Sequence, residues 1–534
     1  MFVIKLLKTS GVTISFAVLT LLWACNTNKN SEVVQWPYGV KYEIFVMSFA
    51  DGDGNGKGDF KGLTTKLDYL KDLGINGIWL MPIMPSDTYH KYHVIDYKNI
   101  DPDYGTLDDF KIFVEEAHKR NIKIITDFVI NHTGNLHPWF LEAQKGKDNP
   151  YRNYYVWAKK DSIRGQIFKK PISFDSDNIR KWHAVNSDTV SEHYYGYFNS
   201  LCPDLNLDNP KVKEELIDIA KFWLNEVKVD GFRMDAARHI FMDERAEDNH
   251  AFWVWFQQEM KKIKPDVYLV GEVWSDAKTV APYLKGLPSL FNFDLGYAIT
   301  NVARSGQDSI GLVKKYKDIS DYYKSITTEY LDATFVKNHD QTRLLTELKG
   351  DQDKAKMAAS LLLTLPGTPY LYYGEEIGMV GDKLKTYEDF FGPDAYVREP
   401  FIWDLDKKDP MQTSWEKPEF STDSTVVPYS IQKGDPQSLL NFYKKIIHYR
   451  NSSLPLTQGE IDHSGINISE VVGFKRKFKD EEELVLHNVS DVEVTVKLEG
   501  ANNKFKSIAF NTEEQIRFQD GEITLPAYST VILK

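Results

Sequence analysis

The sequence predicts an α/β fold: a (β/α)8 TIM barrel with an inserted domain after its third strand, followed by an antiparallel β-sandwich domain. Short apolar runs typical of buried parallel strands alternate with amphipathic stretches typical of helices. Eight strand-like runs in this order are what a closed parallel barrel requires. The strand-like runs are 42–49, 75–81, 122–130, 229–234, 267–270, 290–293, 334–336 and 369–373, and the helical patterns include 63–73, 107–120, 212–226, 355–365 and 438–450.

Two stretches depart from this alternation. Residues 132–202 are rich in aromatic residues and poor in helical periodicity, and a connection of this length inside a compact fold is usually functional. After the last barrel helix, short alternating strand-like runs separated by turn residues predict a separate β domain, at 471–478, 484–490, 492–500, 513–519 and 529–534. We therefore expect the barrel to comprise 41–131 and 203–452, the inserted domain 132–202, and the C-terminal domain 453–534.

The N-terminus has the features of an export signal. Residues 1–24 combine two lysines with an apolar stretch too short to span a bilayer comfortably. The stretch ends in Leu22-Trp23-Ala24-Cys25, which resembles a bacterial lipobox, and predicts a lipid on Cys25. Residues 25–40 would then form a tether, and the protein would be exported and lipid-anchored to the bacterial cell envelope. An ordinary cleaved signal, or a disulfide between Cys25 and Cys202, remains an alternative.

The composition narrows the choice of ligand. The 534 residues contain 65 Lys and Arg against 77 Asp and Glu, and the net charge of -12 argues against nucleic acid as a partner. The 29 Tyr, 30 Phe and 12 Trp suit a sugar binder, because the apolar face of a pyranose packs on an aromatic ring. Nothing in the sequence indicates an oligomeric state.

Four short segments end strand-like runs with residues suited to cutting a glycosidic bond. Parallel strands deliver their C-terminal ends to one rim of a barrel, so residues distant in sequence meet there. Three of these ends carry an acid, and Asp235, Glu272 and Asp340 are the catalytic candidates. The segments are DFVINH (127–132), DGFRMDAARH (230–239), LVGEVW (269–274) and FVKNHD (335–340).

The order and the amino-acid patterns of these segments resemble the signature regions of glycoside hydrolase family 13, the α-amylase family. PDLN (203–206) and YYGEEIGM (372–379) fit the same pattern, and the resemblance covers nearly all of 42–534. The resemblance implies that the insertion is the small B domain that walls one side of the cleft. It also implies that Asp235 is the nucleophile, Glu272 the acid/base, and Asp340 the carboxylate that binds the distorted sugar.

The residues beside the two central acids agree with these roles. Retaining hydrolysis needs one carboxylate to attack the anomeric carbon and a second, protonated carboxyl group ~5 to 5.5 Å away to release the leaving oxygen. Strand alternation places Arg233 on the same side as Asp235, where a guanidinium favours the ionised carboxylate. Glu272 lies between Val270 and Val273 with no cation beside it in sequence, so an apolar setting could raise its pKa.

Arg233 is also a candidate for binding the substrate, and the resemblance extends to five others. His132 and His339 would hold sugar hydroxyls, and Tyr92 matches the stacking tyrosine of the family. His93 stands where the family usually has Asp or another polar residue. Arg238 and His239 end a segment that resembles the Ala-x-Lys-His pattern of α-1,4-acting amylases, with Arg238 replacing the lysine as a donor on the leaving side.

The segment 51–59 places oxygen-bearing side chains at alternate positions, as a loop that binds a hard cation does. It opens like an EF-hand loop but has Gly62 where that loop needs a bidentate Glu. A solvated acidic turn is the alternative. The resemblance implies calcium bound by Asp51, Asp53, Asn55, Asp59 and the carbonyl of Lys57. A second family calcium site would use Asn131 and the carbonyl of His239.

We therefore expect an endo-acting α-amylase that cleaves starch-like α-glucans. The enzymatic alternative is a neopullulanase- or cyclomaltodextrinase-like enzyme, or an α-glucosidase, acting on α-1,6 bonds or short oligosaccharides. Transglycosylation competes with hydrolysis, because water and a second sugar attack the same covalent intermediate. A noncatalytic glucan-binding lipoprotein is the alternative outside the enzymes.

Overall fold

The computed structural model describes residues 34–166, 181–185, 192–383, 394–405 and 408–534. The predicted signal peptide, Cys25 and most of the tether lie outside the described residues. Within the described ranges, no helix is both long enough and apolar enough to cross a membrane.

Eight parallel strands form the centre of the molecule, as the sequence predicts. They pair in the order β10-β11-β1-β2-β3-β7-β8-β9. A parallel bridge between Phe291 and Ala333 joins the two ends of this sheet, and the amide of Asn292 donates to the carbonyl of Ala333 at 2.9 Å. The barrel is thereby nearly closed. The strands are β1 Lys41–Ile44, β2 Gly77–Leu80, β3 Lys123–Phe128, β7 Gly231–Met234, β8 Tyr268–Gly271, β9 Ser289–Leu290, β10 Ala333–Phe335 and β11 Thr368–Tyr372.

Large side chains fill the interior of the barrel, as the packing of this fold requires. Trp79, Phe291 and Tyr370 pack together there, with ring centroids 5.0 to 6.2 Å apart. The strands are shorter than their apolar runs. In the first run, β1 ends at Ile44 and the remainder turns into the short helix α1 Val46–Phe49.

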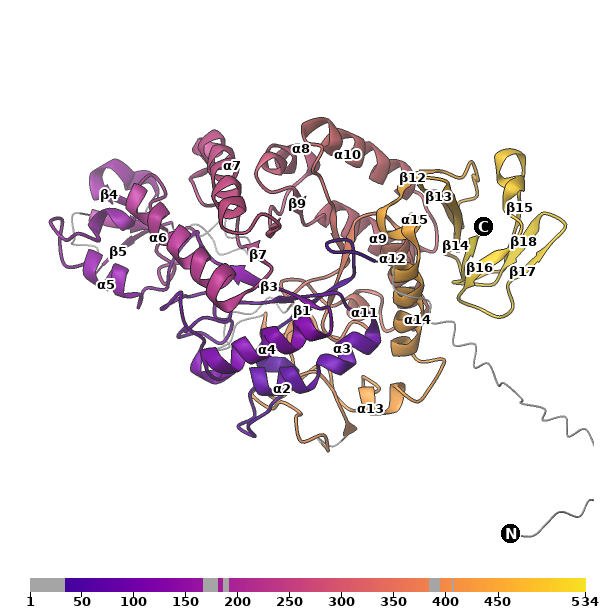
Figure 1. The fold of residues 1–534 in the computed structure, drawn as a ribbon, viewed down its shortest axis with the longest axis horizontal. Helices are drawn as coiled ribbons and strands as arrows, with labels where there is room; N and C mark the ends of the chain where they lie inside the picture. The colour runs from indigo at the N-terminus through magenta and orange to yellow at the C-terminus, as the bar shows by residue number, and fades with distance from the viewer. Residues whose placement is uncertain (1–33, 167–180, 186–191, 384–393, 406–407) are drawn as a thin grey trace, which may run out of the picture.

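Helices surround the strand barrel (Figure 1). The predicted helix 63–73 is two helices, because Asp59 caps the first through the amide of Gly62 and the chain breaks at Lys66. The predicted helix 212–226 continues past α6 as a π-helical turn and ends at Lys228 in a left-handed conformation. The principal helices are α2 Phe60–Thr65, α3 Leu67–Leu73, α4 Leu107–Lys119, α6 Pro210–Lys221, α7 Ala246–Ile263, α9 Phe293–Ser305, α10 Leu312–Ile326, α12 Gln352–Thr364 and α14 Leu439–Ser452, and the shorter ones include α8 Ala277–Val280, α11 Leu344–Glu347 and α13 Tyr429–Gln432.

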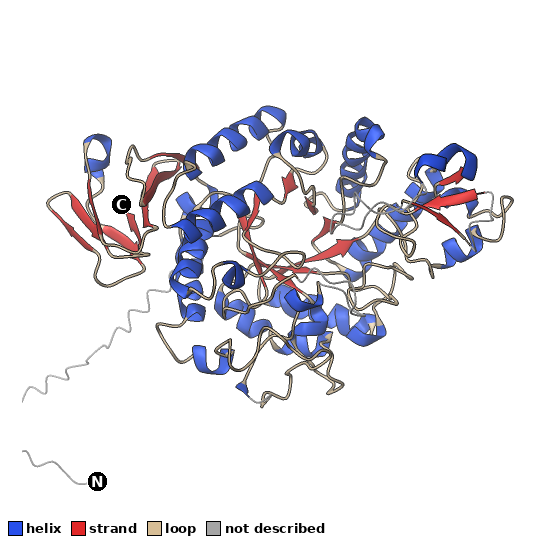
Figure 2. Cartoon of the chain, turned by 180° about the vertical axis from the view of Figure 1, so that it is seen from behind, coloured by secondary structure: helices blue, strands red, loops and turns tan. Residues whose placement is uncertain are grey.

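The insertion after β3 folds as a small unit at one end of the molecule (Figures 1 and 2). It contains the helix α5 Pro138–Ala143 and a three-stranded antiparallel sheet in the order β4-β6-β5. Bridges between His132 and Asp204 and between Tyr155 and Leu205 close its base, so the insertion is anchored beside the C-terminal end of β3. Its strands are β4 Trp157–Lys159, β5 Trp182–Ala184 and β6 Glu192–Tyr195.

The C-terminal domain lies at the opposite end (Figure 2) and forms a β-sandwich of a five-stranded and a three-stranded antiparallel sheet. Their facing sides bury a separate apolar core that includes Leu486, Val496 and Ile523. The strand-like runs of the sequence correspond to β13, β14, β15, β17 and β19, and three further strands were not predicted. After α15 Leu454–Gln458, the strands are β12 Glu460–His463, β13 Val471–Phe478, β14 Glu481–Asn488, β15 Val494–Lys497, β16 Ile508–Asn511, β17 Arg517–Gln519, β18 Glu522–Leu525 and β19 Thr530–Leu533.

Candidate active site

A cleft of about 770 Å³ opens at the C-terminal rim of the barrel, beside the insertion. All three acids proposed from the sequence lie in its wall, together with four of the six proposed substrate-binding residues. The proposed site residues that line it are Asp235, Glu272, Asp340, Tyr92, His132, Arg238 and His239.

Asp235 follows the last residue of β7 and is buried. Strand alternation points it the same way as Arg233, and Nη1 of Arg233 donates to Oδ1 of Asp235 at 2.6 Å. Burial raises the pKa of Asp235, and the charge of Arg233 opposes that rise. The predicted contact is present, but burial outweighs the guanidinium.

Glu272 follows β8 and also contacts Arg233, through Nη2 at 2.7 Å from Oε2. The sequence around Glu272 contains no cation, and the one that contacts it comes from the neighbouring strand β7. The expected direction of the pKa still holds. Burial raises the pKa of Glu272 to about 7, and Asp235 and Asp340 add to the rise while Arg233 opposes it.

Asp340 lies beyond the end of β10 and is held from two sides. Nη2 of Arg398 donates to its Oδ1 at 2.9 Å, and Nε2 of His339 lies 3.2 Å from its Oδ2. Its amide also donates to the side chain of Asn338 at 3.0 Å. The third carboxylate is therefore fixed in orientation at the mouth of the barrel.

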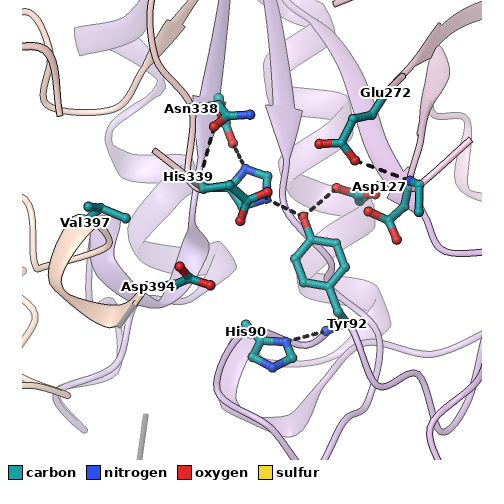
Figure 3. A network of polar contacts seen from close by, with 12 residues as sticks. His90, Tyr92, Asp127, Glu272, Asn338, His339, Asp394 and Val397 are labelled. Atoms are coloured by element: carbon teal, nitrogen blue, oxygen red, sulfur yellow. Dashed lines mark hydrogen bonds and ion pairs between the residues drawn. The ribbon is translucent and has the colours of Figure 1, made fainter. Parts of the chain in front are cut away.

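Tyr92 connects His339 with the floor of the cleft (Figure 3). Its hydroxyl lies 2.8 Å from Nε2 of His339 and 3.2 Å from Oδ2 of Asp127, and its ring is stacked on the imidazole at 5.8 Å. Asp127 is completely buried on β3 and accepts two hydrogen bonds from Nη1 of Arg233, at 2.9 and 3.0 Å. Arg233 is thus held by three carboxylates.

The remaining predicted substrate residues take different positions. His132 is buried, with Nδ1 2.9 Å from the side chain of Asn131 and no partner for Nε2 among the described residues. A sugar hydroxyl is a suitable partner for that nitrogen. His239 stacks on Tyr197 from the insertion at 4.0 Å. Arg238 lies half-buried in the wall of the cleft, and Arg233 is buried behind the acids.

Several residues of the site were not singled out from the sequence. Asp127 stands within a recognised segment but was read as part of the strand. Glu43 sits inside the first apolar run, and Arg398 belongs to a stretch with no periodic signal. Trp274 is 44% exposed, stacks on Phe293 at 4.5 Å and lines the cleft next to Glu272.

The predicted cation loop places its carboxylates together. Oxygen atoms of Asp51, Asp53 and Asp59 lie within 4.8 Å of one another. Asp51 accepts from the amides of Gly54 and Gly56, both at 2.7 Å, so the backbone wraps around the carboxylate. The side chain of Asn55 bonds to Asp53 at 3.1 Å. The donor set of hard oxygen ligands fits calcium.

The groups proposed for a second cation lie close together. Nδ2 of Asn131 donates to the carbonyl of His239 at 2.7 Å and lies 3.4 Å from Oδ2 of Asp204. The sequence named the first two of these groups and missed Asp204, which is buried and whose pKa burial raises to about 8.

Cys202, the cysteine that the structure describes, is a buried free thiol in the wall of the cleft. Burial raises the pKa of the thiol well above its usual value. Such a thiol is unreactive.

Comparisons with known proteins agree with this geometry. The family described as "Alpha amylase, catalytic domain" matches residues 43–459, and "Alpha-amylase SusG C-terminal domain" matches 471–532. The chain is 41% identical to alpha-amylase 3 of Dictyoglomus thermophilum, over 92% of each chain, and 33% identical to a 4-alpha-glucanotransferase of Thermotoga neapolitana, over 85% of this chain and 96% of that one. The crystal structure of an alpha-amylase from H. orenii superimposes with a TM-score of 0.82 at 43% identity, covering 93% of this chain and 99% of that one.

Proposed function

This chain belongs to the α-amylase family of glycoside hydrolases, and we propose that it is a retaining, endo-acting enzyme that cleaves internal α-1,4-glucosidic bonds of starch-like glucans and maltooligosaccharides. The observation that carries this proposal is the contact of Asp235 and Glu272 with adjacent nitrogens of one guanidinium, in a cleft that also contains Asp340. That arrangement places two carboxyl groups within reach of one glycosidic bond.

The reaction follows from the environments of the two acids. Asp235 attacks the anomeric carbon, while Glu272, whose pKa of about 7 lets it carry a proton, protonates the departing glycosidic oxygen. The resulting glycosyl ester on Asp235 is then hydrolysed by water that the ionised Glu272 activates. Asp340 opposes the positive charge that develops on the sugar ring in both steps.

Substitution of the nucleophile tests the chemistry. Asp235→Asn should lower kcat on amylose at least ~10³-fold, because the amide cannot form the glycosyl ester. Proton NMR of the first products of the wild-type enzyme should show the α-anomer, as retention requires. Hydrolysis at the wild-type rate by Asp235→Asn, or release of the β-anomer, would contradict the assignment.

The choice of bond is tested by chromatography of products from amylose, pullulan and isomaltose. An α-amylase releases mixed maltooligosaccharides from amylose and leaves isomaltose intact. Release of panose from pullulan, or action on short oligomers alone, would favour the neopullulanase-like or α-glucosidase alternative. Elongated products from maltooligosaccharides would indicate glucan transfer, the activity named for the Thermotoga neapolitana relative.

The acidic loop supports a structural calcium ion in this proposal. Asp51, Asp53, Asn55 and Asp59 would hold the ion with their side-chain oxygens, and Lys57 with its carbonyl. The ion would neutralise the mutual repulsion of the carboxylates and tie the loop after β1 together. The loop lies outside the wall of the cleft, so its contribution is to stability.

The lipobox-like segment supports export and a lipid on Cys25. Cys25→Ala should move the protein from the membrane fraction to the soluble fraction of a host that processes lipoproteins. Intact-mass measurement of the purified wild-type protein should show the acyl groups. A soluble wild-type protein that lacks the first 24 residues and any acyl mass would favour an ordinary cleaved signal.

A further inference from the structure

We propose that Glu43 is a positioning residue of the active site: through His339, it keeps a hydrogen on the imidazole nitrogen that faces Asp340. The proposal rests on the role given above to Asp340. It assigns a function to a residue on the barrel strand β1, opposite the strands that carry the nucleophile and the acid/base.

Glu43 and His339 form an isolated buried pair. Each is about 1% exposed, and Oε1 of Glu43 makes a short hydrogen bond to Nδ1 of His339. Glu43 points into the barrel because the strand alternates, whereas its neighbour Tyr42 points outward to Glu376. No described residue other than Glu43 contacts Nδ1 of His339 within hydrogen-bond distance.

The other nitrogen of His339 must act as a donor. Nε2 lies 3.2 Å from Oδ2 of Asp340 and 2.8 Å from the hydroxyl oxygen of Tyr92. Tyr92 has Asp127 at 3.2 Å as an acceptor for its own hydrogen, and it accepts from Arg233 at 3.4 Å. Both neighbours of Nε2 therefore offer lone pairs, and a bare Nε2 would repel them.

A hydrogen on Nε2 fixes the state of the pair. Either Glu43 is a carboxylic acid that donates to Nδ1 of a neutral imidazole, or Glu43 is ionised beside an imidazolium. Both states hold two hydrogens and no net charge. Burial raises the pKa of Glu43 and lowers that of His339, which favours the neutral state.

The surrounding charges come from five other parts of the fold. Asp127 on β3 and Arg233 on β7 act on Glu43, and Asp340 beyond β10 acts on it as well. Arg398 and Asp394 act on His339, as do Arg233 and Lys383. Arg233, Arg398 and Lys383 disfavour an imidazolium at His339. The resting state is therefore the carboxylic acid of Glu43 beside a neutral imidazole.

Loss of Glu43 would remove the group that occupies the lone pair of Nδ1, so the ring would divide its single hydrogen between Nδ1 and Nε2. In the form with hydrogen on Nδ1, Nε2 presents a lone pair to Asp340, and the carboxylate loses one of its two side-chain supports. Glu43→Leu should therefore lower kcat by about 10- to 100-fold with little change in KM, the range found when the group that orients a metal-bound histidine is removed. Glu43→Gln should stay close to wild type, because its amide donates to Nδ1 as the carboxylic acid does.

The position of the hydrogen can be measured without substrate. ¹⁵N NMR of the histidine-labelled protein, with His339→Asn to identify the signal, should show hydrogen on Nε2 in the wild type and in Glu43→Gln, and a mixture of the two tautomers in Glu43→Leu. Glu376→Gln, which alters a buried carboxyl group on the outer side of β1, should keep the His339 signal and the wild-type kcat.

A wild-type His339 without hydrogen on Nε2 would overturn the proposal even if Glu43→Leu failed to fold. So would Glu43→Leu with wild-type kcat or an unchanged His339 signal. These readouts concern the resting protein, whereas failure of the proposed hydrolytic function would appear in Asp235→Asn, so the two failures are distinguishable.

Discussion

Asp235 and Glu272 share one cation: Arg233 lies 2.6 Å from the first carboxylate and 2.7 Å from the second. The guanidinium is itself buried, and the same Nη1 that contacts Asp235 also donates a hydrogen bond to Asp127. Because Arg233 lowers the pKa of both carboxyl groups against the effect of burial, it sets the pH range in which one is ionised while the other is protonated.

Replacement of Arg233 by Gln should move the whole pH profile to higher pH. Without the cation the pKa of Asp235 rises, so the nucleophile ionises at higher pH and the acidic limb moves upward. The pKa of Glu272 also rises, so the acid keeps its proton to higher pH and the alkaline limb moves the same way. We expect kcat/KM at the optimum to fall about 10²- to 10³-fold. Arg238→Gln removes a cation of the same cleft wall that forms no ion pair with either acid among the described residues, and it should leave both limbs in place.

The wild-type enzyme should lose activity on amylose as the pH rises through about 7, the pKa to which burial raises Glu272. Activity falls with rising pH because the first step needs Glu272 in its protonated form. Fluoride leaves without protonation, so kcat/KM for an α-maltosyl fluoride should not fall over the same pH range. A parallel fall for both substrates would mean that Glu272 is not the group that titrates.

The sequence predicts the barrel and the three acids because both depend on local patterns. Each strand is an apolar run, and Asp235, Glu272 and Asp340 each follow one. Contacts across the barrel leave no such pattern. Arg233, which contacts Glu272, belongs to another strand, and Glu43 contacts His339, which lies 296 positions away in sequence. The unpredicted strand β18 alternates over only four residues, too few for a distinct signal.

Calcium should stabilise the folded protein through the loop after β1. The clustered oxygens of Asp51, Asp53 and Asp59 repel one another, so a bound cation raises the free energy of unfolding by about 2.7 kcal/mol when its concentration is 100 times Kd. Calorimetry should show Tm rising with added calcium and falling with EDTA. Asp53→Ala should abolish this dependence, and Asp72→Ala, an exposed acid on α3 outside the loop, should keep it. A wild-type Tm that does not change when calcium is added or removed would contradict the assignment.

Arg476 joins the C-terminal domain to the barrel. It is fully buried on β13, and its guanidinium donates to the carbonyls of Thr364 at the end of α12, and of Leu456 and Gly459 at 2.8 and 2.9 Å. Arg476→Met would keep an apolar side chain of similar length but leave these buried acceptors without a donor, at a cost of about 3 kcal/mol. Thermal unfolding should show a lower Tm, while kcat at room temperature stays unchanged because the domain lies away from the cleft.

Arg517→Met, at a 74% exposed position on β17, is the matched control and should leave Tm unchanged. Equal Tm values for the two variants would show that the buried guanidinium does not hold the domains together.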